Sequence, residues 1–151
     1  MITTRRFDRA IDKLYTAFHS GLLHPECSRN CAVGNICENR DFWKGFSDEH
    51  GSIHLSYVGK INELFNRKFY GFSPSELLKI ESAFLAGCGY ELPLRKNSRR
   101  PENPFSKDIL FNGLVEAVSQ LCKLDGIPDV MDCSSLFEYE RPDASKGLET
   151  V

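Results

Sequence analysis

The feature of this sequence that most restricts the fold is a segment whose two ends both mark an α-helix, from Ser73 to Gly89. Ser73 can accept a hydrogen bond from the third helical amide, Glu76 can reach back to the Ser73 backbone, and Pro74 needs no donor in the first turn. Gly89 can adopt the left-handed conformation that ends many helices. Apolar residues between these ends recur at spacings of three and four, as on a helix with one buried face: Leu77, Leu78, Ile80, Phe84, Leu85 and Cys88. The segment therefore predicts a core helix over residues 73–88.

Two other segments show the same helical spacing. Over residues 4–20 the apolar positions are Phe7, Ile11, Leu14, Tyr15 and Phe18, and Gly21 can end the helix. Over residues 107–123 they are Ile109, Leu110, Leu114, Val118, Leu121 and Cys122, before a break at residues 125–128 that contains Gly126 and Pro128. Each segment predicts a long helix with one face in the core.

Shorter helices are predicted in the less regular parts of the chain. Pro25 suits a first helical turn, which predicts a helix over residues 25–33 that Gly34 and Asn35 would end. A helix is also expected over residues 52–66, with a strand over 53–57 as the alternative, and a last short helix around Leu136 and Phe137. Together these elements predict an all-α, single-domain bundle of about five or six helices over residues 1–140, followed by a flexible tail at 141–151.

Composition excludes several classes of protein. The chain has 151 residues, 41% of them hydrophobic and 26% charged, with a formal net charge of -2, which suits one globular domain and no nucleic-acid partner. No apolar run approaches the roughly 20 residues of a membrane span, and the N-terminus has no secretory pattern. We therefore expect a cytoplasmic protein, in which the six cysteines stay reduced and serve as metal ligands, redox groups or core residues.

Thiols and imidazoles are dense between His24 and Cys37. Cys27 and Cys31 are four residues apart, so a helix over 25–33 would place both thiols on one face, close enough to hold one metal ion. Three more residues could complete the site: His24 near the same face, Cys37 beyond the helix, and Cys88 from the end of another helix. The set predicts a zinc ion or an iron-sulfur cluster bound by Cys27, Cys31, His24, Cys37 and Cys88.

Two alternatives to a metal remain open for these cysteines. The spacing Cys-x₃-Cys-x₅-Cys differs from the ferredoxin patterns, and buried cysteine often serves as a small apolar residue. Cys88 and Cys122 in particular end the apolar faces of long helices, where core packing suits them best. The third possibility is a pair of redox-switching thiols.

Two further clusters have a weaker chemical meaning. His50 and His54 have the spacing of metalloprotease ligands on a helix, but Gly51 stands where the general-base glutamate belongs, which removes the argument for a hydrolase. With Asp48 and Glu49 alongside, the two histidines could still form an oxygen- and nitrogen-rich metal site, or they could lie on the surface. Four basic residues within 95–100 suit a solvated connector or an acidic partner. No phosphate loop, dinucleotide fingerprint or other catalytic motif is present.

Four segments of the sequence together resemble a small bacterial family that commonly carries the label of the F-type component of Na⁺-translocating NADH-quinone reductase. They lie at residues 6–19, at 25–35, at 87–94 (Gly-Cys-Gly-Tyr-Glu-Leu-Pro-Leu) and at 110–114 (Leu-Phe-Asn-Gly-Leu). The resemblance covers nearly the whole chain and implies an association with an oxidoreductase. It implies no catalytic residue, because the flavin, NADH and [2Fe-2S] domains of the genuine reductase component do not fit in 151 mostly helical residues. The family pattern has paired cysteines where this chain has Cys27-Ser28 and often lacks a thiol at Cys37, so it favours Cys27 and Cys31 as ligands.

Three hypotheses for function follow. The first is a non-hydrolytic accessory protein that binds a metal ion or an iron-sulfur cluster at Cys27 and Cys31, in a regulatory or an electron-transfer role. The second is a metal-free helical interaction module with buried cysteines, whose basic loop meets an acidic protein partner. The third is a thiol redox sensor.

Overall fold

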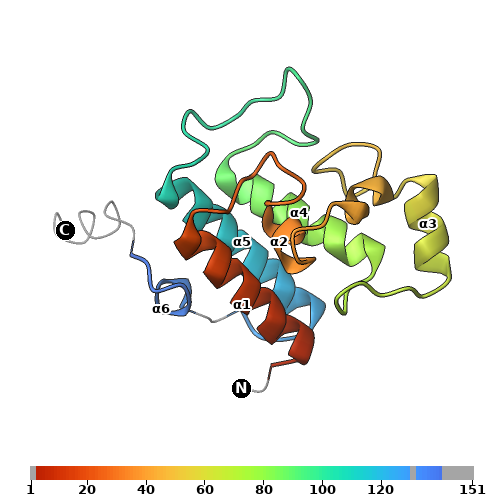
Figure 1. The fold of residues 1–151 in the computed structure, drawn as a ribbon, viewed down its shortest axis with the longest axis horizontal. Coiled ribbons are helices and arrows are strands. Elements are labelled where there is room, and N and C mark those ends of the chain that lie inside the picture. Colours follow the sequence, from red (N-terminus) through yellow and green to blue (C-terminus); the bar gives the residue numbers. More distant parts are fainter. Residues whose placement is uncertain (1–2, 130–131, 141–151) are drawn as a thin grey trace.

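Six α-helices and one 3₁₀ helix form the regular structure of the residues described, 3–129 and 132–140, in a computed structural model of the chain (Figure 1). They are α1 (Arg5–Ser20), α2 (Ala32–Ile36), η1 (Phe42–Phe46), α3 (Tyr57–Leu64), α4 (Pro74–Cys88), α5 (Lys107–Leu124) and α6 (Cys133–Leu136). The described ranges contain two isolated β-bridges and no longer strand. The predicted all-α, single-domain fold is confirmed. The tail predicted at 141–151 lies outside the described residues.

Helices α4 and α5 form the most extensive helix-helix contact of the fold. The capping box predicted at the start of α4 is present, and Gly89 ends this helix at a φ of 99°. Two glycines let the backbones of the pair touch. A Cβ atom on Gly87 would lie 2.7 Å from the Asn112 carbonyl oxygen, and one on Gly113 would lie 2.4 Å from Cys88 Sγ. The pair is therefore a closely packed support for the other elements.

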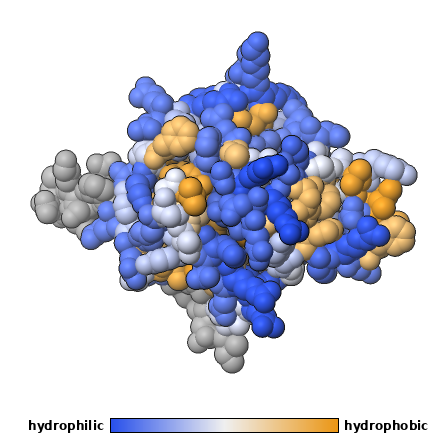
Figure 2. Space-filling model, viewed as in Figure 1, coloured by the Kyte–Doolittle hydropathy of each residue, from blue (hydrophilic) through white to orange (hydrophobic). Residues whose placement is uncertain are grey.

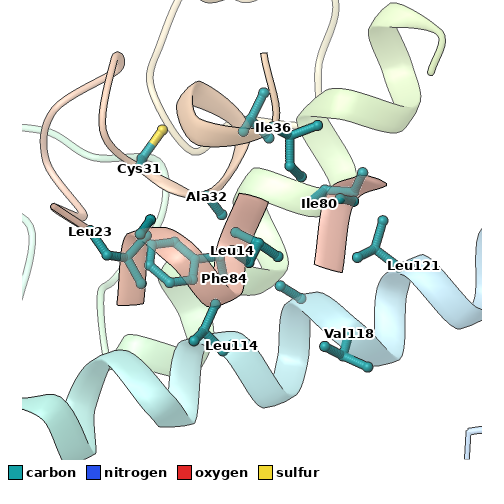
Figure 3. Packing of buried hydrophobic residues seen from close by; sticks show 14 of the residues in the cluster. Leu14, Leu23, Cys31, Ala32, Ile36, Ile80, Phe84, Leu114, Val118 and Leu121 are labelled. Carbon is teal, nitrogen blue, oxygen red and sulfur yellow. The ribbon is translucent and has the colours of Figure 1, made fainter. Parts of the chain in front are cut away.

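Helix α1 packs against this pair and completes the central core. Leu14, Phe84 and Leu114, one from each long helix, are fully buried and face one another (Figure 3). At the end of the core, Arg6 donates from Nε to Asp125 Oδ1 at 2.7 Å and from Nη1 to Glu76 Oε1 at 2.9 Å. This one guanidinium thus ties the start of α1 to the end of α5 and the start of α4.

The helix predicted over residues 25–33 is wrong. Turns occupy this stretch, and α2 begins only at Ala32, with Cys31 as the N-cap whose sulfur accepts from the Gly34 amide at 3.4 Å. Gly34 and Asn35, expected to end the helix, are buried inside α2 instead. The Asn35 side chain donates to the carbonyls of Asn30 at 2.8 Å and Cys31 at 3.0 Å, so it holds the preceding turn against the helix.

Helix α3 is shorter than the predicted span of 52–66. It begins at Tyr57 because Ser56 caps it, accepting from the Gly59 amide at 3.1 Å and donating to the Gly45 carbonyl at 2.6 Å. The alternative strand is also absent from the described structure at 53–57, where Leu55 makes only an isolated bridge. Figure 1 places α3 at the edge of the molecule, and Figure 2 shows apolar residues exposed on that side. Among the described residues, no helix is both long and apolar enough to cross a membrane.

Candidate metal centre

A thiol, an imidazole and a carboxylate converge at one place in the fold. The ligand atoms of Cys31, His50 and Glu81 all lie within 4.8 Å of one another. Cys31 is the N-cap of α2, His50 lies in the loop between η1 and α3, and Glu81 lies in the middle of α4. Three separate segments therefore build the cluster, and the central helix pair supplies the carboxylate.

Glu81 is a charged residue on the apolar face of α4. It lies one turn from Leu77 and one turn from Leu85, and all three are 0% exposed. Its Oε1 accepts from the Val33 amide at 3.1 Å, and its Oε2 contacts His50 Nε2 at 2.7 Å. A buried carboxylate is costly unless hydrogen-bonded and paired with a cation, so both contacts are needed to hold Glu81 in the core.

The Cys31 thiol is fully buried next to this carboxylate. Burial and the Glu81 charge raise the pKa of Cys31 well above its ordinary value, so without a cation the thiol keeps its proton. Its sulfur already accepts a hydrogen bond from Gly34, a contact that suits a thiolate. In Figure 3, Cys31 lies at the edge of the core, and its sulfur points away from Leu23 and Phe84.

His50 forms the solvent-facing side of the cluster. Its ring packs edge-on against Trp43, with 5.8 Å between centroids, and Trp43 Nε1 donates to the Ser28 carbonyl at 3.0 Å. The Leu94 amide donates to the His50 carbonyl at 2.8 Å, which fixes the backbone behind the ring. A pocket of about 240 Å³, lined by His50, Glu81, Trp43 and the residues around them, connects the cluster to the surface.

The donor set suits zinc. Zinc takes thiolate, imidazole and carboxylate ligands at about 2.0–2.3 Å in a tetrahedron, so bound ligand atoms lie roughly 3–4 Å apart. Side-chain shifts of about 1 Å would bring the three groups from their present separation to that geometry. Iron-sulfur clusters are held mainly by several cysteine thiolates, so one thiol among three donors fits them poorly. With three protein ligands, the fourth position would face the pocket.

Of the five predicted ligands, the structure brings Cys31 into this cluster. His24, Cys27, Cys37 and Cys88 belong to no group of three such donor atoms in the described ranges. Cys27 and Cys31 do not share a helix, so the geometric reason for pairing them is lost. The His24 ring packs on Phe105 at 4.7 Å.

Sequence reasoning missed one member of the cluster and misplaced another. Glu81 had a visible signal, because it is the one acidic residue on an otherwise apolar helical stripe. His50 was singled out, but as a partner of His54, which is exposed and outside the cluster. Nothing in the spacing linked His50 to Glu81, which lies 31 residues further along the chain.

The basic loop at 95–100 is partly neutralised within the protein. Arg95 pairs with Glu49 at 2.6 Å, and Arg100 pairs with Glu26 at 3.3 Å. The loop therefore offers an acidic partner fewer free charges than its sequence suggests.

Comparison of the chain with protein-family models, with curated proteins and with solved structures found no match. The family resemblance drawn from the sequence stays a prediction.

Proposed function

We propose that this protein binds one zinc ion through Cys31, His50 and Glu81 and that the open fourth position serves a regulatory role. The observation that supports it is the convergence of three donor atoms within 4.8 Å, two of them on side chains with no exposed surface. A zinc ion would neutralise the carboxylate, release the thiol proton and leave one position facing a pocket. Zinc has no redox chemistry, so the proposal favours regulation over electron transfer.

The competing interpretation of the cluster is a metal-free ion pair. A protonated His50 beside Glu81 at 2.7 Å would balance the buried charge, and Cys31 would remain a core thiol. This arrangement corresponds to the second hypothesis, a metal-free helical module. The two interpretations differ in whether zinc is bound and in whether Cys31 is needed for it.

The test is the zinc content and zinc affinity of protein purified under reducing conditions. We expect one zinc per chain, together with a thiolate-to-cobalt absorption band when cobalt replaces it. Cys31→Ser, His50→Gln and Glu81→Gln should each weaken zinc binding by a factor of roughly 100 or more, since loss of even an outer-shell partner costs about 10–100-fold. Cys27→Ser and Cys133→Ser are matched controls, because both thiols are only partly buried and lie outside the cluster.

Chelation provides an independent readout. If zinc binds the folded chain, a chelator should lower the melting temperature of the wild type and leave that of Cys31→Ser unchanged. Circular dichroism of each variant establishes that it remains helical. Wild-type protein without stoichiometric zinc, or a Cys31→Ser variant that keeps it, would overturn the proposal in favour of the ion pair.

A further inference from the structure

Helix α3 carries an apolar stripe that faces solvent. Tyr57, Val58, Ile61, Leu64 and Phe65 recur at helical spacing and fall within roughly 120° of the helix circumference at about 100° per residue. Leu64 is 78% exposed, Phe65 is 65% exposed and Tyr57 is 79% exposed. A stripe of this kind normally faces the core of its own protein. Here it is free to meet another surface.

The opposite face of α3 is fixed to the body of the protein. Gly59 packs so closely against η1 that a Cβ atom would lie 2.3 Å from the Phe46 carbonyl oxygen. Glu63 accepts from the Ser75 amide at 3.1 Å, at the start of α4. Because these contacts set the rotation of the helix, α3 holds its stripe outward as a built feature.

The stripe is bordered by positive charge. Lys60, Arg67 and Lys68 are exposed, and none of them forms a salt bridge within the described ranges. The nearest acidic side chain on the helix, Glu63, is engaged with Ser75 through both oxygens. A cationic rim around bulky apolar groups therefore stands out on a chain whose net charge is -2.

We infer that α3 and the residues after it, 57–68, dock on an anionic lipid surface. Exposed leucine and aromatic groups flanked by lysine and arginine are the pattern of interfacial helices, which bind through apolar insertion and attraction to acidic headgroups. The stripe lies at an edge of the molecule (Figures 1 and 2), so it can enter a bilayer interface before the rest of the surface does. A twofold contact with a second copy would place like charges against each other. Charge therefore favours lipid over self-association.

The experiment is sedimentation with vesicles of phosphatidylcholine, with and without about 30% phosphatidylglycerol as the anionic lipid. We expect binding to the anionic vesicles only, weakened when salt is raised well above about 0.1 M. Combined Leu64→Ser and Phe65→Ser should weaken binding at least tenfold, roughly the effect of losing one buried apolar side chain. Lys60→Gln with Lys68→Gln should weaken it about fivefold per charge.

Matched controls use equally exposed residues elsewhere. Leu22 and Phe105 are each 58% exposed and lie outside 57–68, so Leu22→Ser with Phe105→Ser should bind as the wild type does. Arg9→Gln with Lys13→Gln, two exposed cations of α1, controls for net charge. Equal losses in the control pairs, or no binding to anionic vesicles, would overturn the inference. A dimer in sedimentation velocity that only the Leu64 and Phe65 variant abolishes would assign the surface to a second copy and overturn it as well.

Discussion

Replacing Gly34 by alanine would put a methyl group where the backbone of the preceding turn already lies. The new Cβ would meet the Ser28 carbonyl oxygen at 2.4 Å and the Arg29 carbonyl carbon and oxygen at 2.5 Å. Backbone on both sides leaves no side chain to rotate away, so the turn must shift. Overpacking of this kind costs about 1–3 kcal/mol, and displacing the Ser28 oxygen that accepts from Trp43 adds about 1 kcal/mol for that hydrogen bond.

We therefore expect the free energy of unfolding to fall by about 3 kcal/mol, which for this chain length lowers the melting temperature by roughly 6–12 °C. Urea denaturation followed by circular dichroism measures the change. Because the displaced turn leads into Cys31, zinc affinity should fall too. Gly45→Ala is the control, since nothing lies within 4 Å of a Cβ there, and its stability should change by less than about 1 kcal/mol. Equal stability of the two variants would refute the packing argument.

Two further predictions concern stability. Ser73→Ala should lower the free energy of unfolding by about 1 kcal/mol because the hydroxyl caps α4, whereas Ser106→Ala should have little effect, since Ser106 makes no side-chain cap bond at α5; equal losses in urea denaturation would contradict the capping assignment. Burial, with the Glu81 charge, raises the pKa of the Cys88 thiol to about 12 from the usual 9.0, so the folded state favours the protonated form. Stability is then fully present below about pH 9 and is lost as the pH rises toward 12. From about pH 8 to about pH 10, Cys88→Ala should lose about 1.4 kcal/mol less stability than the wild type, and an identical pH dependence would contradict the burial of this thiol.

The long helices could be predicted because their signals are local. Ser73 and Gly89 mark the ends of α4 within a few residues, and the stripes of α1 and α5 need only helical periodicity. The region around α2 could not be predicted this way. Its N-cap is Cys31, outside the usual set of capping residues, and Gly34 lies inside the helix because another segment packs on its Cα. Both facts depend on tertiary contacts.

The candidate site could be predicted only in part for a similar reason. The dense cysteines correctly drew attention to Cys31, and the single charge on the face of α4 could have drawn it to Glu81. Their association with His50 depends on how the loop after η1 folds back over α4. No sequence spacing encodes that distance, so the ligand set became visible only in three dimensions.

The backbone contact between α4 and α5 assigns unequal roles to the three donors. Glu81 stands on a helix locked by Gly87 and Gly113 to its neighbour, so its carboxylate moves only if the whole pair opens. Cys31 and His50 stand on a turn and a loop, which can open locally at far lower free energy. An incoming ion would therefore meet a stationary anchor first and be enclosed afterwards by the thiol and the imidazole. Release would follow the reverse order, so the rate of metal exchange would report the opening of these two segments and not the unfolding of the core.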